Sequence, residues 1–441
     1  MKARWATSLA LGEFVLAAAS WASCGGEDQP TWCDESFGYV CRAGAAGASG
    51  SGGGGGPAGA SGNAGAGGAS GLGGGGSGGV GGLVCNAPEI DCDGQCVDVK
   101  ASDAANCGAC GRSCRGSTCS AGACVPEVMA TGEVAPYALA HDATHLYWAS
   151  PAVKSEVGFI PRLRRVAKAS AGGAAENAFG SAVVRARSLA FAGGKLYFGD
   201  LEANSVLSGT PGSLFPDSPA FAEGQLDVRH LAIAADKAFW SAGGSAAIRG
   251  KALAGGAVDP NVLGQDNPAW VAADEAGVPY WVAGVTREVR RPKASPPGYE
   301  AFATGAGVVA VELAGERVYW ADAAAGVVRS AAKTDTPPAA GTVAFSGRGR
   351  VEGFRVEGTT LYVVTLEAGA LEAWRKGEGD DEPFLLGKIA AKAAGYAGNP
   401  FGAAYVLVDE SYLYVADVGT VDTNQVVPVS QGDGVVYRVA R

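Results

Sequence analysis

The segment VVAVELAGERVYWAD, residues 308–322, decides the fold of this chain. It reads as a short apolar strand that reaches a turn at Gly315 and continues into a second strand with two adjacent rings, Tyr319 and Trp320. A glycine at such a point suits the tight turn of a hairpin. The segment therefore predicts a two-stranded β-hairpin.

The same pattern occurs seven times in the carboxy-terminal part of the chain. Its central aromatic residues are spaced 39 to 52 residues apart: Tyr147, Tyr197, Phe239, Tyr280, Tyr319, Tyr362 and Tyr414. Repeats of about 40 to 50 residues with strand character are typical of propeller blades. We expect an all-β fold with a seven-bladed β-propeller over residues 125–441, in which the large rings fill the space between neighbouring sheets.

The two ends of the repeat region complement one another. The last unit ends at its third strand, VVYRVAR, residues 435–441, whereas PEVMATGEV, residues 126–134, precedes the first unit. Pairing of the two segments would complete the last blade and protect its edge. We therefore predict that residues 127–133 lie beside residues 435–440 and close the ring.

Three of the repeats carry a further motif. YWAD at 319–322, YFGD at 197–200 and YVAD at 414–417 resemble the YWTD repeats of six-bladed receptor propellers, and the units are also similar to NHL-type propellers. The resemblance implies a propeller across the whole region. Seven motifs, where the receptor family has six, predict one more blade than that family.

Residues 1–23 are predicted to be an export signal. Lys2 and Arg4 precede a mostly apolar stretch, residues 5–19, which is too short to span a bilayer. Trp21-Ala22-Ser23-Cys24 resembles the lipobox of bacterial lipoproteins, which implies lipidation of Cys24 and, with Gly25 following, a place in the outer membrane or at the cell surface. Cleavage by an ordinary signal peptidase, giving a secreted or periplasmic protein, is the alternative. We expect membrane contact through the lipid anchor only.

Residues 24–42 would form a lipid-anchored segment, and residues 43–84 a disordered linker. The linker has 22 Gly in 42 positions, and such a segment cannot bury enough apolar surface to fold. The chain has a net charge of -10, which does not suit a phosphate backbone, so we expect no nucleic-acid partner.

The cysteines indicate an oxidising compartment. Apart from Cys24 they number ten, all before Val125: Cys33, Cys41, Cys85, Cys92, Cys96, Cys107, Cys110, Cys114, Cys119 and Cys124. An even set in an exported chain predicts disulfides, with the pairing left open. Residues 85–124 would form a disulfide module, which resembles short Cys-rich modules in exported proteins of myxobacteria. The Cys107-to-Cys110 spacing also fits a zinc or redox site, but the surrounding cysteines favour structural disulfides.

Ligands of propellers usually bind where loops lead into the innermost strands. The candidate ligand face there consists of arginines and rings: Tyr137, Arg187, Arg229, Trp270, Arg350 and Phe401. These groups suit an anionic or sugar-like ligand if they converge, and would otherwise be solvated loop residues. Glu352, Asn267 and Asn399 are similar to the calcium ligands of lactonase-like propellers, which is a second possibility.

Catalytic motifs are scarce in this sequence. It has only three His, and neither a GxSxG nor an HExxH motif. We expect no metal and no cofactor. The sequence favours a monomeric, non-catalytic cell-surface lipoprotein whose propeller binds a protein, glycan or small molecule. The alternative is an exported propeller enzyme of the hydrolase or lactonase type that uses the central channel.

Overall fold

A computed structural model describes residues 83–150, 154–155, 162–169, 171–180, 185–262, 267–293, 298–390, 404–422 and 429–441. The predicted export signal, Cys24, Cys33, Cys41 and the linker up to Gly82 lie outside these residues, as does Phe401.

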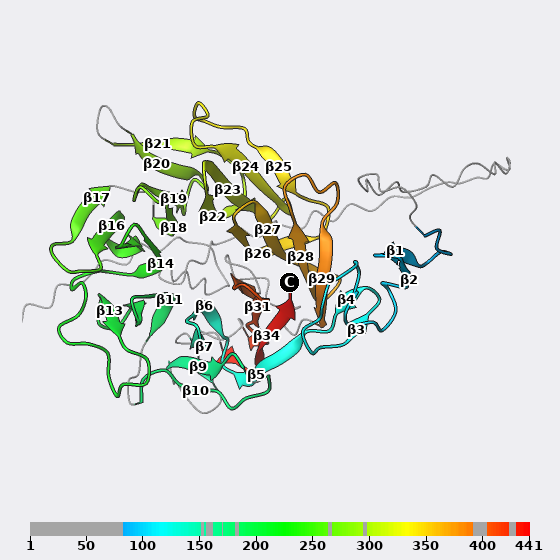
Figure 1. The fold of residues 1–441 in the computed structure, drawn as a ribbon. Coiled ribbons are helices and arrows are strands. Elements are labelled where there is room, and N and C mark those ends of the chain that lie inside the picture. Colours follow the sequence, from blue (N-terminus) through cyan, green and yellow to red (C-terminus); the bar gives the residue numbers. More distant parts are fainter. Residues whose placement is uncertain are drawn as a thin grey trace, which may run out of the picture.

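The described chain after the module forms seven β-sheets arranged around a common axis, which confirms the predicted seven-bladed propeller (Figure 1). The first strand of each blade is innermost, and these seven strands contact one another in a closed circle. Blade 1 consists of β6 (Tyr137–His141), β7 (His145–Ser150), β9 (Arg162–Ala167) and β10 (Glu176–Asn177). Blade 2 consists of β11 (Ala186–Ala192), β12 (Lys195–Asp200) and β13 (Ser205–Gly209). Blade 3 consists of β14 (Val228–Ala234), β15 (Lys237–Ala242), β16 (Ala247–Ala252) and β17 (Asp259–Val262). In blade 2 the outer position is held by a single bridge between Val206 and Ala222.

Blades 4 to 6 have four antiparallel strands each. Blade 4 consists of β18 (Pro268–Ala273), β19 (Pro279–Ala283), β20 (Val289–Lys293) and β21 (Gly298–Ala303). Blade 5 consists of β22 (Val308–Ala314), β23 (Arg317–Asp322), β24 (Val327–Ala332) and β25 (Thr342–Phe345). Blade 6 consists of β26 (Arg350–Glu357), β27 (Thr360–Glu367), β28 (Ala370–Lys376) and β29 (Phe384–Ala390). The described residues contain one helical turn, the 3-10 segment η2 (Gly243–Ser245). No described helix is long and apolar enough to cross a bilayer.

Blade 7 joins both ends of the propeller and confirms the predicted closure. Its strands are β30 (Ala404–Val408), β31 (Tyr412–Asp417), β34 (Gly434–Ala440) and, as the outer strand, β5 (Glu127–Glu133). β5 and β34 are antiparallel, with Ala130 opposite Val436 and Glu127 opposite Arg438. An ion pair of 2.8 Å between Arg438 and Glu127 adds to the backbone pairing.

A smaller sheet connects excursions from the first and last blades. It consists of β32 (Val421–Asp422), β33 (Val429–Ser430) and β8 (Lys154–Ser155), with β33 and β8 parallel. The sheet therefore adds a second link between blades 7 and 1, beside the ring closure.

The aromatic residues of the repeat fill the spaces between blades, as predicted. Trp148, Trp240, Trp281 and Trp320 are buried, and so are six of the seven central aromatic residues. Tyr319 is the exception and is half-buried. Its cross-strand neighbour is Glu312, a charged residue where the first four blades have alanine.

Two hairpin turns show why aspartate precedes tyrosine in this repeat. Asp142 accepts hydrogen bonds from the backbone N–H of His145 and, at 2.7 Å, from the Tyr147 hydroxyl. Asp409 likewise accepts from the Tyr412 N–H and, at 2.9 Å, from the Tyr414 hydroxyl. The carboxylate therefore fixes both the turn and the central tyrosine of the next strand.

The eight cysteines of the module form four disulfides, which confirms this part of the prediction. The pairs are Cys85–Cys96, Cys92–Cys110, Cys107–Cys119 and Cys114–Cys124. The module contains the hairpins β1 (Ile90–Cys92) with β2 (Gln95–Val97) and β3 (Cys119–Ser120) with β4 (Ala123–Cys124). In Figure 1, β1 and β2 project away from the propeller, whereas β3 and β4 lie next to β29.

Candidate ligand-binding site on the propeller axis

The inner strands carry different side chains at equivalent positions of the seven blades. The residue of each inner strand that pairs with the central aromatic is, from blade 1 to blade 7, Ala140, Ala190, Ala232, Ala272, Glu312, Arg355 and Leu407. Blades 1 to 4 thus present a methyl group where blades 5 and 6 present an opposite pair of charges.

Arg355 connects the inner strands of three blades. From β26 its guanidinium forms an ion pair with Glu312 on β22, and it lies 5.9 Å from the ring centre of Trp270 on β18. Because blades 6 and 4 are not neighbours, the side chain must pass along the inner side of blade 5. Burial raises the pKa of the Glu312 carboxyl, and the positive charge of Arg355 opposes this effect.

His230 on β14 extends this arrangement to blade 3. Its ring stacks on Trp270 with the ring centres 3.7 Å apart. Its Nδ1 lies 2.9 Å from the Val271 carbonyl oxygen, so Nδ1–H donates and Nε2 keeps its lone pair as an acceptor. Burial first, and then the nearby Arg355 charge, lower the pKa of His230 to about 3. The ring is therefore neutral at physiological pH.

We call His230, Trp270, Glu312 and Arg355 the axial stack. These residues come from four consecutive inner strands, and each keeps part of its surface exposed. The indole Nε1–H of Trp270 has no hydrogen-bond partner among the described residues. The axial stack therefore offers a ligand the neutral His230 ring and a balanced pair of charges, whereas the Trp270 Nε1–H is enclosed by the protein.

Three of the predicted ligand-face residues lie together where the inner strands of blades 1 to 3 begin. Arg187 and Arg229 both bind Asp227, at 3.0 and 2.6 Å. Tyr137 is near enough for Arg187 and Asp227 to influence its ionisation, while burial is the main cause of its raised pKa. The two guanidinium groups share one carboxylate, so these three side chains together carry a net charge of about +1.

The remaining predicted residues occupy other places. Trp270 belongs to the axial stack, and Arg350 pairs with the buried Glu352 at 2.7 Å on blade 6. Tyr137 also packs edge-on against Tyr405 of blade 7, with ring centres 4.8 Å apart. The arginines predicted to face a ligand are thus each engaged with a carboxylate of the protein.

Asp227, Glu312 and Arg355 are site residues that were not predicted from the sequence. A usable signal exists for Glu312, because it is the one charged residue in the apolar inner-strand segment VVAVELA, at the position where four other blades have alanine. Arg355 has no such signal, because its strand RVEGFRVE contains three other charged residues. Asp227 carries no comparable signal, because it lies in a loop and adopts a left-handed backbone with φ of 53°.

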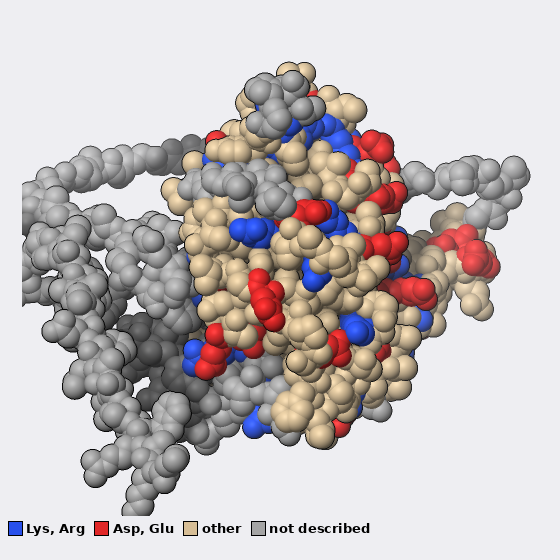
Figure 2. Space-filling view, turned by 90° about the vertical axis from the view of Figure 1, so that its left-hand side faces the viewer, with Lys and Arg blue, Asp and Glu red and all other residues tan. Residues whose placement is uncertain are grey.

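The described residues contain one group of three side chains with metal-ligand spacing, Cys107, Cys114 and Cys124. All three sulfur atoms are part of disulfides and so are not thiolates. Of the suggested calcium ligands, Glu352 pairs with Arg350 and Asn399 lies outside the described residues. On the face of the molecule in Figure 2, cationic and anionic side chains are interspersed.

No family model and no curated protein matches this chain. Solved structures with the same fold are found at low sequence identity. One streptogramin B lyase structure has a TM-score of 0.50 and 8% identity, covering 72% of this chain and 97% of that one. Virginiamycin B lyase from Staphylococcus aureus has a TM-score of 0.49, 10% identity and coverage of 71% and 98%.

A third structure is the extracellular domain of a B. thetaiotaomicron protein assigned to the one component systems. It has a TM-score of 0.46 and 11% identity, covering 71% of this chain and 39% of that one. At 8% identity the streptogramin B lyase structure shows a shared fold alone and leaves the activity of this chain undetermined.

Proposed function

We propose that this chain is an exported binding protein whose propeller binds a small polar ligand at the axial stack. The observation that carries this proposal is the concentration of polar and aromatic side chains on the inner side of blades 3 to 6. The first four blades have alanine beside the central aromatic, whereas blades 5 and 6 have Glu312 and Arg355 at the same position. Such a few polar groups in an otherwise apolar setting are typical of binding sites.

The chemistry of the axial stack favours binding over turnover. His230 has a pKa of about 3 and is therefore a weak base near pH 7. The Glu312 carboxylate is engaged by Arg355. Both groups can hold a ligand by hydrogen bonds, whereas proton transfer at neutral pH would require a base with a pKa nearer 7.

The binding test uses the full chain and thermal shift with a library of metabolites and glycans, because a ligand that binds only the native state raises the unfolding midpoint. The matched variant is Glu312→Gln with Arg355→Met, in which neither charge is left unpaired. The control is Arg115→Met, which removes an exposed charge from the module.

We expect at least one compound to raise the midpoint of the native chain and of the control, and to lose this effect in the double variant. An equal shift in the double variant would place the ligand elsewhere. Chemical conversion of the bound compound by the native chain would establish the enzyme alternative.

We further propose that Cys24 carries a lipid and that residues 43–84 hold the propeller away from an outer membrane. Support comes from the lipobox-like segment and from the four disulfides of the module, which are typical of exported proteins. Metabolic labelling with a fatty acid should mark the native chain and not Cys24→Ser. Labelling of both, or of neither, would contradict lipidation at this residue.

A further inference from the structure

Two arginines lie where the inner strands of blades 2 and 3 begin. Arg187 is on β11 and Arg229 is on β14, and these two strands contact one another. Each arginine lies in a β-bulge, because the pairing register of its strand shifts by one residue at this point. A bulge directs a side chain out of the regular alternation of the strand, and bulges are common next to functional sites.

The inner strands of four other blades have a bulge at the equivalent point, but with different side chains. The bulge residues of blades 1, 4, 5 and 6 are Ala138, Ala269, Val309 and Glu352. Glu352 pairs with Arg350 on its own strand. Among the described bulges, arginine at this level of the ring is therefore confined to blades 2 and 3.

Asp227 holds the two guanidinium groups in place. Its Oδ1 accepts from Arg187 Nη1 at 3.0 Å, and its Oδ2 lies 2.6 Å from both Nε and Nη2 of Arg229. The backbone of η2 closes one side of this contact, because a Cβ atom on Gly243 would lie 2.5 Å from Arg229 Nε and from Asp227 Oδ2. The donors are thus oriented by the protein itself, and a ligand need not order them.

Two donors of this cluster remain for a ligand. Arg229 Nη1 forms no hydrogen bond with a described residue, and it is not one of the enclosed atoms that lack a partner. The same holds for the hydroxyl of Tyr137, which is near Arg187 and Asp227. Burial raises the pKa of this hydroxyl, so it stays protonated and can donate. A guanidinium N–H and a phenol O–H together suit an oxygen anion.

Charge decides which kind of group fits. Asp227 cancels one of the two positive charges, so about one remains. Arg185, which directly precedes β11, pairs with Glu202 at 3.6 Å. The two other arginines of the described inner strands, Arg350 and Arg355, each pair with a carboxylate of their own. In a chain of net charge -10, the excess positive charge of the inner strands is thus local to blades 2 and 3, where it attracts a small anion.

We propose that Arg187, Arg229 and Tyr137 form an oxyanion site, which binds the carboxylate or phosphate group of a small organic acid. Asp227 is a positioning residue, because it orients both guanidinium groups and cancels part of their charge. Arg229 directly precedes His230 of the axial stack on β14, so the rest of a bound acid can extend to that stack. This extension alone rests on the proposed function.

The test is calorimetric titration of the full chain with inorganic phosphate and, separately, with acetate, at constant ionic strength. Arg187→Met removes one positive charge and keeps much of the side-chain volume. Asp227→Asn removes the negative charge and keeps an acceptor oxygen for the arginines. Arg115→Met and Glu275→Gln are the matched controls, because they change the net charge by the same amounts at exposed positions.

We expect saturable binding of at least one anion, about tenfold weaker in Arg187→Met, about threefold tighter in Asp227→Asn and unchanged in both controls. Tyr137→Phe, which removes only a hydroxyl, should weaken binding about threefold and serves if Arg187→Met does not fold. Tighter binding of phosphate would assign the site to phosphate esters, and tighter binding of acetate to carboxylic acids. No saturable binding, equal binding in Arg187→Met, or weaker binding in Asp227→Asn would overturn the proposal.

The double variant Glu312→Gln with Arg355→Met separates the oxyanion site from the proposed function. Binding of phosphate or acetate should persist in this variant, whereas a ligand of the axial stack should be lost. Loss of anion binding in the double variant would place the anion at the axial stack and would overturn the oxyanion site. Anion binding by a native chain that binds no library compound would support the oxyanion site and contradict the axial site alone.

Discussion

The two halves of the Cys-rich module each contain disulfides and are joined by Cys92–Cys110, but their surroundings differ. The projecting half, residues 83–97, exposes Val84 and Ile90 to solvent, and its hairpin lies away from the propeller (Figure 1). In the docked half, residues 99–124, Cys107, Cys114, Cys119 and Cys124 share a buried cluster with Ala440 and Tyr412 of blade 7.

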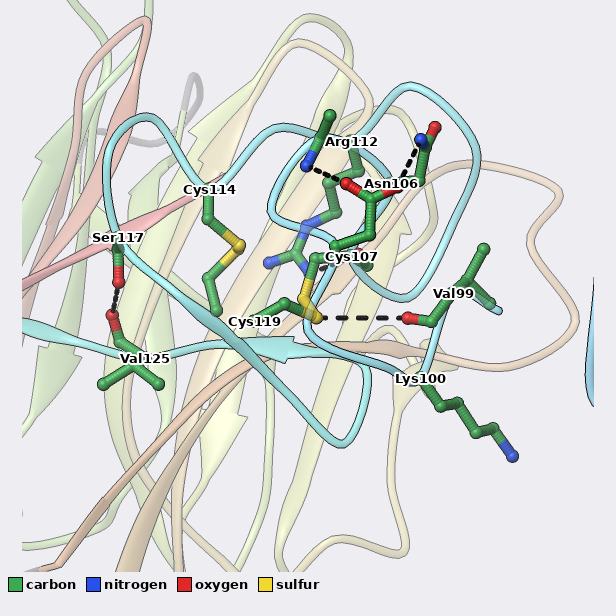
Figure 3. The surroundings of a disulfide bond; sticks show 12 residues. Val99, Lys100, Asn106, Cys107, Arg112, Cys114, Ser117, Cys119 and Val125 are labelled. Atoms are coloured by element: carbon green, nitrogen blue, oxygen red, sulfur yellow. Dashed lines mark hydrogen bonds between the residues drawn. A yellow bond between two sulfur atoms is a disulfide. The ribbon is translucent and has the colours of Figure 1, made fainter. Parts of the chain in front are cut away.

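Arg112 explains how the docked half is held. Its guanidinium donates to the carbonyl oxygens of Cys107 at 2.9 Å, Leu386 at 2.9 Å and Ala440 at 3.2 Å. It also lies 4.7 Å from the ring centre of Phe384. Figure 3 shows Arg112 close to Cys107 and Cys119. A module too short for a core of its own is thus stabilised by packing against a neighbouring domain. We therefore expect changes in the docked half to affect propeller stability more than changes in the projecting half.

The largest effect is expected from the disulfides. Replacing Cys107 and Cys119 by alanine should lower the free energy of unfolding of the propeller by about 3 to 5 kcal/mol, because the change removes both a cross-link and buried contacts to blade 7. Replacing Cys85 and Cys96 should leave the propeller transition within about 0.5 kcal/mol of the native value.

Tryptophan fluorescence during denaturation reports the propeller and not the module, because six of the nine Trp lie in the propeller, three precede residue 33 and none lies in the module. Equal losses of stability from the two pairs of substitutions would refute the distinction between the halves.

Gly108 gives a more local test. A Cβ atom at this residue would lie 2.2 Å from the Gly122 carbonyl oxygen and 2.5 Å from the Phe384 ring, and φ is 79°. We expect Gly108→Ala to destabilise the propeller by about 2 to 4 kcal/mol through the clash and the backbone strain. Gly94→Ala in the projecting half is the matched control, with a φ of 83° and nothing within 4 Å of the added atom.

Denaturation of both glycine variants, followed by tryptophan fluorescence, should show a loss for Gly108→Ala alone. A loss of similar size in Gly94→Ala would mean that the halves are coupled.

Arg112→Met keeps much of the side-chain volume but leaves buried carbonyl oxygens without a donor. The expected loss is about 2 to 3 kcal/mol. Arg115→Met, at an exposed position, should change stability by less than about 0.5 kcal/mol. Limited proteolysis should also cleave the docked half faster in Arg112→Met, and an unchanged cleavage rate would argue against Arg112 as the attachment.

The smallest effect is a pH dependence beside the docked half, at the turn before Tyr412. Burial alone would raise the pKa of Asp409, but hydrogen bonds from Lys168, Ser411, Tyr412 and Tyr414 outweigh it and lower the pKa to about 2. Since the folded pKa is below the ordinary value, this stabilisation is complete above about pH 5 and is lost as the pH falls towards 2.

Asp409→Asn should therefore cost about 1 to 2 kcal/mol at pH 7 and almost nothing near pH 2. Urea denaturation of both proteins across this pH range measures the difference. A difference that does not change with pH would show that the Asp409 charge is not responsible.

The repeat made the propeller predictable, because each Tyr or Phe of the pattern recurs at blade spacing and the unpaired segment around Met129 had one free edge to join. The axial stack was less predictable, because Arg355 contacts Glu312 and Trp270, which lie on two other blades. Spacing along the chain does not encode contacts between blades. Docking of the module was unpredictable for the same reason, since Gly108 packs close to Phe384 of blade 6, which is far away in the sequence.

The pairing of β5 with β34 also constrains how the molecule can form. β5 is synthesised first among the propeller strands, and its partner ends one residue before the carboxy terminus. β5 therefore cannot gain its strand partner until the other strands of the propeller have been synthesised, and Met129, which is fully buried in the closed ring, depends on that pairing. Loss of β34 would leave β5 without its strand partner and would open the ring at this point.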